Sequence, residues 1–82
     1  APLLKIKVDA DDPAAAVRAV REAAPKAALI VDPNESWDAT LLRATMPVLK
    51  ECQVAVLEQP VPAGEDEWLG DYTSPVPICA DE

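Results

Sequence analysis

Three acidic residues hold matching places in this 82-residue sequence. Asp32, Glu58 and Asp81 each directly follow a short apolar run, at intervals of roughly 25 residues, which is close to one strand plus one helix. In a parallel sheet the carboxyl ends of the strands lie at one edge, so we expect the three carboxylates to converge there. Close carboxylates repel one another unless a cation neutralises them, and oxygen ligands suit a hard ion such as Mg²⁺. Each acid taken singly is better explained as a cap for the helix that follows, but the repeated position favours a metal site.

Two lysines in the first apolar run could supply a base. Lys5 and Lys7 are two positions apart, so in a strand they share one face, with Ile6 and Val8 on the other. A lysine that is desolvated beside a cation has a lowered pKa and can act as a base near neutral pH. Because Lys7 is nearer the carboxyl end of the strand, we expect it to lie nearer the carboxylates. A solvated strand face explains the same pair of lysines, and the pair alone does not separate the two interpretations.

The elements that must position these side chains follow from the apolar pattern. We expect strands over residues 3–8, 27–31, 54–57 and 76–80, and helices over residues 13–24, 38–51 and 65–69. Strands that alternate with helices and read as unbroken apolar runs are typical of a parallel sheet, so the predicted fold class is α/β.

Prolines and one acid mark where these elements begin and end. Asp12 can cap the first helix and Pro13 suits its first turn, while Pro25 stops that helix. Pro47 should kink or divide the second helix, and Pro77 makes the last strand the least regular.

Composition excludes some partners and leaves others open. Fifteen acidic residues against seven basic ones give a formal net charge of −8, which disfavours binding to nucleic acid. No apolar run approaches the ~20 residues needed to cross a membrane. The absence of histidine weakens the case for zinc. Cys52 and Cys79 could form a disulfide, but their apolar surroundings favour reduced thiols in the core. We interpret Trp37 and Trp68 as packing residues over the mouth of the fold or between helices.

Four blocks of the sequence resemble the enolase superfamily, and specifically its muconate-cycloisomerase-like subgroup. They are LKIKV, IVDPNESW, LEQP and PICADE, at residues 4–8, 30–37, 57–60 and 77–82. The resemblance covers essentially the whole chain, and the NESW, EQPVPA and PICADE runs are most similar to bacterial L-Ala-D/L-Glu epimerases. It implies a partial (β/α)₈ barrel of the TIM type, with about four parallel strands and the helices between them.

The same resemblance implies a role for each candidate residue. Asp32, Glu58 and Asp81 match the three Mg²⁺ ligands of the family, and Asn34 and Glu82 lie beside ligands and would support them.

The two lysines match the Lys-x-Lys motif of the family. Lys7 matches the acid/base on one face of the substrate α-carbon, and Lys5 matches a helper near the substrate carboxylate. By analogy the reaction removes the α-proton of a small-molecule dipeptide to give an enediolate that Mg²⁺ stabilises, and a second base returns a proton from the other face.

The resemblance also implies that more sequence is needed for activity. Residues 1–82 correspond to a fragment of the C-terminal barrel domain, so the N-terminal capping domain, the later strands and the opposing lysine lie outside them. The parent enzyme is expected to be a cytoplasmic dipeptide epimerase of peptidoglycan recycling, and homo-oligomers are possible. An o-succinylbenzoate synthase, an N-succinylamino-acid racemase, a cycloisomerase and a non-catalytic structural fragment stay open as alternatives.

Overall fold

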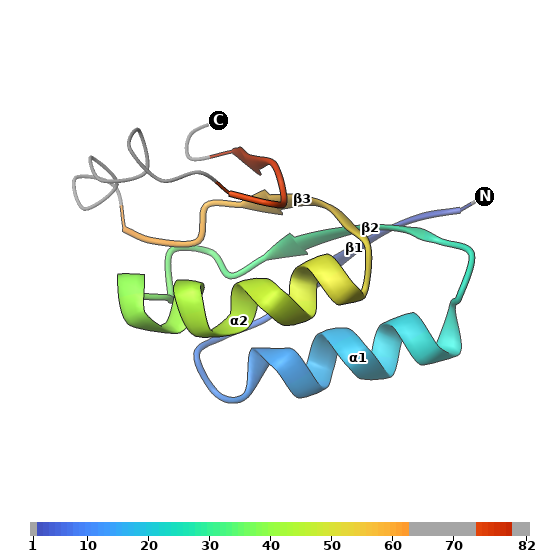
Figure 1. Cartoon of the computed structure of the whole chain (residues 1–82), viewed down its shortest axis with the longest axis horizontal. Helices are drawn as coiled ribbons and strands as arrows, with labels where there is room; N and C mark the ends of the chain where they lie inside the picture. Colours follow the sequence, from blue (N-terminus) through green and yellow to red (C-terminus); the bar gives the residue numbers. More distant parts are fainter. Residues whose placement is uncertain (1, 63–73, 80–82) are drawn as a thin grey trace.

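A computed structural model of the chain describes residues 2–62 and 74–79. Its four strands are parallel and stand in chain order in one sheet. They are β1 (Leu3–Lys7), β2 (Ala28–Asp32), β3 (Val54–Glu58) and β4 (Ile78–Cys79). Helices α1 (Pro13–Ala23) and α2 (Ala39–Glu51) both cover the same face of this sheet (Figure 1). The predicted α/β fold with parallel neighbouring strands is confirmed.

Both helices begin at an aspartate cap. The Asp12 carboxylate accepts a hydrogen bond from the Ala15 amide at 3.3 Å, and Asp38 accepts one from the Leu41 amide at 2.7 Å. Each cap satisfies an amide that the first helical turn would leave without a partner. The cap at Asp12 and the end of α1 before Pro25 agree with the prediction.

Pro47 lies inside α2 without dividing it, so the division that we allowed for is wrong. Met46 and Leu49 on either side of the proline are buried against the rest of the core. Tertiary packing of this kind can hold a helix together across the hydrogen bond that a proline removes.

The last strand begins later than predicted. Only Ile78 and Cys79 of the described residues pair with β3, opposite Leu57 and Glu58. Pro77 has no amide hydrogen to donate, although its carbonyl accepts from the Leu57 amide at 2.9 Å. The predicted helix over residues 65–69 lies outside the described residues.

The core fills the space between the helices and one face of the sheet. Six of its side chains are fully buried, namely Val17, Leu29, Val31, Leu42, Leu49 and Leu57. Burial of a side chain of this size contributes about 1.5–3 kcal/mol, so this layer is the main source of stability.

The first strand alternates between this core and the open face of the sheet. Ile6 and Val8 pack against the core, whereas Lys5 and Lys7 are exposed. The predicted period of two is therefore confirmed for β1.

The two cysteines have different surroundings. Neither is in a disulfide, and Cys52 is buried in the core as predicted. The prediction of a core position for Cys79 is wrong, because this residue is exposed. Its register with Glu58 places it on the open face, away from the helices.

The pairing of β2 with β3 contains an irregularity. Leu29 lies opposite Val54, yet the next residue, Ile30, lies opposite Val56, so Ala55 is an extra residue in β3. Such a bulge changes which side of the sheet the following side chains face.

Candidate functional site

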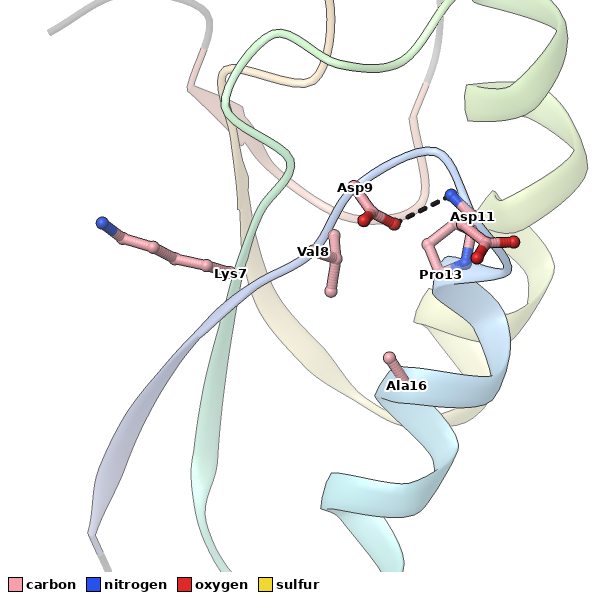
Figure 2. A pocket seen from close by; sticks show the side chains of 6 residues that line it. All are labelled: Lys7, Val8, Asp9, Asp11, Pro13 and Ala16. Carbon is pink, nitrogen blue, oxygen red and sulfur yellow. Dashed lines mark hydrogen bonds between the residues drawn. The ribbon is translucent and has the colours of Figure 1, made fainter.

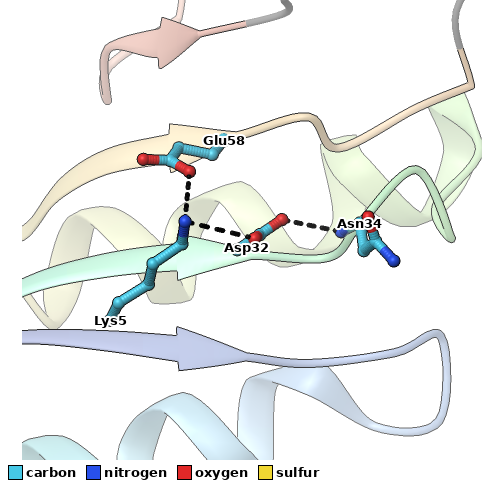
Figure 3. Close-up of polar contacts among 4 residues, drawn as sticks. All are labelled: Lys5, Asp32, Asn34 and Glu58. Atoms are coloured by element: carbon cyan, nitrogen blue, oxygen red, sulfur yellow. Dashed lines mark hydrogen bonds and ion pairs between the residues drawn. The ribbon is translucent and has the colours of Figure 1, made fainter. Parts of the chain in front are cut away.

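Two of the three predicted carboxylates meet at the carboxyl edge of the sheet. Asp32 is the last residue of β2, and Glu58 is the last residue of β3. Both approach the ammonium group of Lys5, whose Nζ is 3.6 Å from Asp32 Oδ2 and 3.0 Å from Glu58 Oε2 (Figure 3). Two strand ends thus direct one carboxylate oxygen each toward a single positive charge.

The Asp32 carboxylate is held in place by its own loop. Its Oδ1 accepts a hydrogen bond from the backbone amide of Asn34 at 2.9 Å, while Oδ2 faces Lys5 (Figure 3). Asp32 is 5 % exposed, so a fixed orientation and a nearby positive charge both offset the cost of burying this acid. Asn34 therefore contacts Asp32 through its main chain, and its role beside a metal ligand stays a prediction.

The lysine that contacts this pair is Lys5. We predicted that Lys7 would lie nearer the carboxylates, and for Asp32 and Glu58 that is wrong. Lys7 is aligned with Asp32 in the sheet, but its side chain extends away from the chain and forms no ion pair within residues 2–62 and 74–79 (Figure 2). The long side chain of Lys5 instead reaches from β1 to the acids at the ends of β2 and β3.

The two neighbouring carboxylates favour the protonated form of Lys5. The hydrogen bond to Glu58 and the charge of that carboxylate, with a smaller effect of Asp32, raise the pKa of Lys5 above its ordinary value of 10.5. Lys5 is thus the positive partner of the two carboxylates in this state.

The same geometry tests whether a metal ion suits these residues. The two carboxylates already share one cation, and oxygen ligands of this type suit Mg²⁺. Among the residues that the structure describes, no group of three His, Cys, Asp or Glu side chains is close enough to form a complete metal centre. The predicted third ligand, Asp81, and its neighbour Glu82 lie outside the described residues.

A separate hollow of about 340 Å³ lies beside the loop that follows β1 (Figure 2). It is lined by Lys7, Val8, Asp9, Asp11, Pro13 and Ala16. The Asp9 carboxylate accepts a hydrogen bond from the Asp11 amide at 2.8 Å, which shapes this loop. Since Asp32 and Glu58 do not line the hollow, it is distinct from the carboxylate pair.

The prediction that Trp37 is a packing residue is confirmed, because it is 1 % exposed. The sequence reasoning missed its second property, a hydrogen bond from the indole Nε1 to the Asp9 carbonyl at 2.9 Å. A buried indole N–H usually finds an acceptor, but the sequence does not indicate which one. Trp68 lies outside the described residues. Neither described helix is long and apolar enough to cross a membrane.

Comparisons with known proteins agree with this geometry. A family model described as "Enolase C-terminal domain-like" matches residues 2–82. The L-Ala-D/L-Glu epimerase of Escherichia coli is 49 % identical over 82 residues, which cover 100 % of this chain and 26 % of that protein. An N-acetyl-D-glutamate racemase of Pseudoalteromonas is 48 % identical over 81 residues, covering 99 % of this chain and 26 % of that protein.

A solved structure gives the same result in three dimensions. It is an enolase family member from Agrobacterium tumefaciens with homology to dipeptide epimerases, with bound sodium and L-Ala-L-Glu. The TM-score is 0.87 at 44 % identity, over 95 % of this chain and 24 % of that one. The chain therefore spans about a quarter of the length of the relatives that it matches.

Proposed function

We propose, since the chain belongs to the enolase C-terminal domain-like family, that it is the metal-binding section of a Mg²⁺-dependent dipeptide epimerase. The observation that carries the proposal is the shared cation of Asp32 and Glu58, which brings acids from two adjacent strands together. The similarity to L-Ala-D/L-Glu epimerases supports the substrate class. In the full-length protein that we propose, later strands would complete the barrel and a capping domain would precede it.

Asp32 and Glu58, with Asp81 as the third ligand, would hold the metal ion. Bound Mg²⁺ would supply positive charge beside the substrate carboxylate, which lowers the cost of removing the α-proton. The Asn34 amide keeps Asp32 oriented, and we propose a supporting role for Glu82 as well.

Lys7 is the residue that we propose to move the proton. Its place at the end of β1, in register with Asp32, sets it at the carboxyl edge. Lys5, and not Lys7, forms the ion pairs with Asp32 and Glu58. The side chain of Lys7 extends over the open face, where substrate would bind (Figure 2). Lys7 would take the α-proton from one face of the substrate carbon or return it there, and a base on the opposite face would complete the epimerisation.

Lys5 has a different role in this proposal. With Mg²⁺ neutralising the two carboxylates beside it, the positive charge of Lys5 would be placed to attract the negatively charged carboxylate of a substrate. It would thereby orient the substrate so that the α-carbon faces Lys7.

A second candidate function has a specific observation in its favour. The N-acetyl-D-glutamate racemase is nearly as similar to this chain as the dipeptide epimerase, at 48 % against 49 % identity. L-Ala-D/L-Glu and N-acetyl-D-glutamate are both glutamates that carry an acyl group on nitrogen. The α-proton chemistry is the same for both, so the choice depends on whether a free ammonium group is recognised. We favour the dipeptide, as further similar proteins are L-Ala-D/L-amino acid epimerases, and a place in cytoplasmic recycling of peptidoglycan peptides follows from that choice.

The test uses the full-length protein that contains this chain, with Mg²⁺ in deuterated water. Exchange of the α-proton is followed by NMR for L-Ala-L-Glu and, in parallel, for N-acetyl-D-glutamate. We expect deuterium incorporation and epimer formation that chelation of the metal abolishes, with higher kcat/KM for the dipeptide. A preference for N-acetyl-D-glutamate would select the second candidate, and no exchange with either compound would reject both.

A further inference from the structure

One buried residue connects the loops that follow the first three strands, through its side chain and its backbone. Trp37 lies in the loop after β2, and its indole Nε1 donates to the carbonyl of Asp9 at 2.9 Å. Its backbone amide donates to the carbonyl of Pro60 at 2.9 Å. Asp9 belongs to the loop after β1, and Pro60 belongs to the loop after β3. A single residue therefore contacts all three loops.

These contacts lie close to the proposed functional side chains. Asp9 follows Lys7 by two residues, and Pro60 follows Glu58 by two residues. Two residues of chain reach at most about 7 Å, so each contact point restrains the strand end beside it. A third link, from the Glu35 amide to the Gln59 carbonyl at 2.6 Å, joins the second and third loops independently of the indole.

The indole link is different from ordinary packing because it is directional. Trp37 is 1 % exposed, and loss of a partner for a buried N–H costs the desolvation of that group. The indole ring can keep its hydrogen bond only while the loop after β1 stays at one distance from the loop after β2. Within the part of the chain that the structure describes, the indole of Trp37 makes the hydrogen bond that joins residues 9–12 to another loop. The other hydrogen bonds of residues 9–12 stay within their own turn and the cap of α1.

We propose that Trp37 is a positioning residue, which sets the placement of Lys7 relative to Asp32 and Glu58 through its contacts with the Asp9 and Pro60 carbonyls. The inference rests on the proposed function, because it assigns the spacing of the base and the metal ligands to the contacts of one residue. A purely structural tryptophan would affect folding alone. Trp37 also controls the relative rates at which protons are exchanged on the two faces of the substrate α-carbon.

The test is Trp37→Phe in the full-length protein. Phenylalanine keeps an aromatic ring and the backbone link to Pro60, and it removes only the indole N–H and part of the ring. The matched control is Leu49→Ala, which removes a fully buried side chain near the carboxyl end of α2 without touching these loops. A second variant carries 3-benzothienylalanine at position 37, which preserves the indole shape without the N–H.

Three measurements separate the possible outcomes. Hydrogen exchange reports on the amides of Val8, bonded to the Asp32 carbonyl, and of Asp11, bonded to the Asp9 carboxylate. Calorimetry reports Mg²⁺ affinity, and α-proton exchange is measured separately for the L-Ala-L-Glu and L-Ala-D-Glu epimers. In Trp37→Phe and the benzothienyl variant we expect faster hydrogen exchange at these amides and nearly unchanged Mg²⁺ affinity.

The ratio of the two epimer rates is the decisive result. Lys7 serves one face of the α-carbon, so its displacement should slow exchange of one epimer by about tenfold or more and the other epimer less. Leu49→Ala should lower stability while it leaves that ratio and the local amide exchange as in the wild type.

The inference is overturned if both variants at position 37 leave the ratio and the amide exchange unchanged, or if they behave as Leu49→Ala does. An inactive wild-type protein would instead reject the proposed function, and with it the role in catalysis. The hydrogen exchange would then still decide whether Trp37 holds the loop after β1.

Discussion

At each end of the sheet one residue makes hydrogen bonds to several segments of the chain, but the two residues differ in kind. At the carboxyl end the neutral indole of Trp37 binds one carbonyl and its backbone binds another. At the amino end the charged guanidinium of Arg21 donates to four carbonyls at the ends of both helices and the start of β2. These acceptors are Cys52 O, Ala24 O, Pro25 O and Ala27 O, at 2.8, 3.0, 3.2 and 2.8 Å.

The difference between Trp37 and Arg21 indicates that the amino end of the sheet serves stability and that the carboxyl end carries the proposed chemistry. Arg21 uses its charge and its several donors to satisfy carbonyls that the helix ends leave open, and no proposed functional residue lies among its partners. At the carboxyl end the charges of Lys5, Asp32 and Glu58 belong to the proposed site, and the neutral indole of Trp37 joins two of the loops around it. A division of this kind, with function at the carboxyl end of the strands, is general in barrel enzymes.

The strongest test of this division is Lys7→Ala in the full-length protein. Loss of a positioned base should slow α-proton exchange by about 10²–10⁴-fold, because general base catalysis of this size depends on a group held within reach of the proton. Mg²⁺ affinity measured by calorimetry should stay close to that of the wild type. Normal exchange with both epimers would show that Lys7 is not the base.

Removal of a carboxylate tests the metal site. Asp32→Asn and Glu58→Gln should each weaken Mg²⁺ binding by about 100-fold, a lower bound set by the effects seen for residues beside metal ligands. Calorimetric titration of the full-length protein measures the change, and thermal melts without metal serve as the folding control. If both variants bound Mg²⁺ as tightly as the wild type, Asp32 and Glu58 would not be metal ligands, and their contact with Lys5 would need another explanation.

At the amino end, Arg21→Met should affect stability alone. The variant keeps the alkyl part of the side chain and leaves four carbonyls without their donor, which should cost about 2 kcal/mol of unfolding free energy. Urea denaturation measures the loss, and Arg18→Met, on an exposed position of the same helix, is the matched control. A change in Mg²⁺ affinity or epimer ratio would break the division between the two ends.

The smallest expected effect concerns Lys5 in the metal-free protein. Its pKa is raised by Glu58 and Asp32, so the contribution of the ion pairs to stability is present below 10.5 and is lost as the pH rises through the folded-state pKa. The half-exposed side chain and the screening by salt keep this contribution smaller than that of Arg21. The stability difference between the wild type and Lys5→Met should therefore shrink in strongly alkaline buffer. A difference that grows with pH there would contradict the assigned ion pairs.

Much of the fold was predictable because its signals are local. The apolar runs that end at Asp32 and Glu58 predict buried parallel strands, and the rule that such strands end at one edge brings the two acids together. The caps at Asp12 and Asp38 are likewise set by residues within one turn.

The parts that sequence reasoning missed depend on contacts between distant residues. The reach of Lys5 to Glu58 crosses β2 and depends on the twist and register of three strands. The acceptor of the Trp37 indole lies 28 residues earlier in the chain, and Arg21 finds one of its acceptors 31 residues later. No short-range pattern specifies such partners.

The extra residue at Ala55 determines which side of the sheet Glu58 faces. In the pairing that starts from Leu29 and Val54, an uninterrupted register would place Leu57 beside Asp32 and turn Glu58 toward the helices. Because Ile30 instead lies opposite Val56, the same register carried to the strand ends sets Glu58 beside Asp32 on the open face. A one-residue deletion in this strand would remove no acidic side chain, yet it would dismantle the pair as surely as replacing Glu58. The proposed site therefore depends on the number of residues in β3 as well as on their identity.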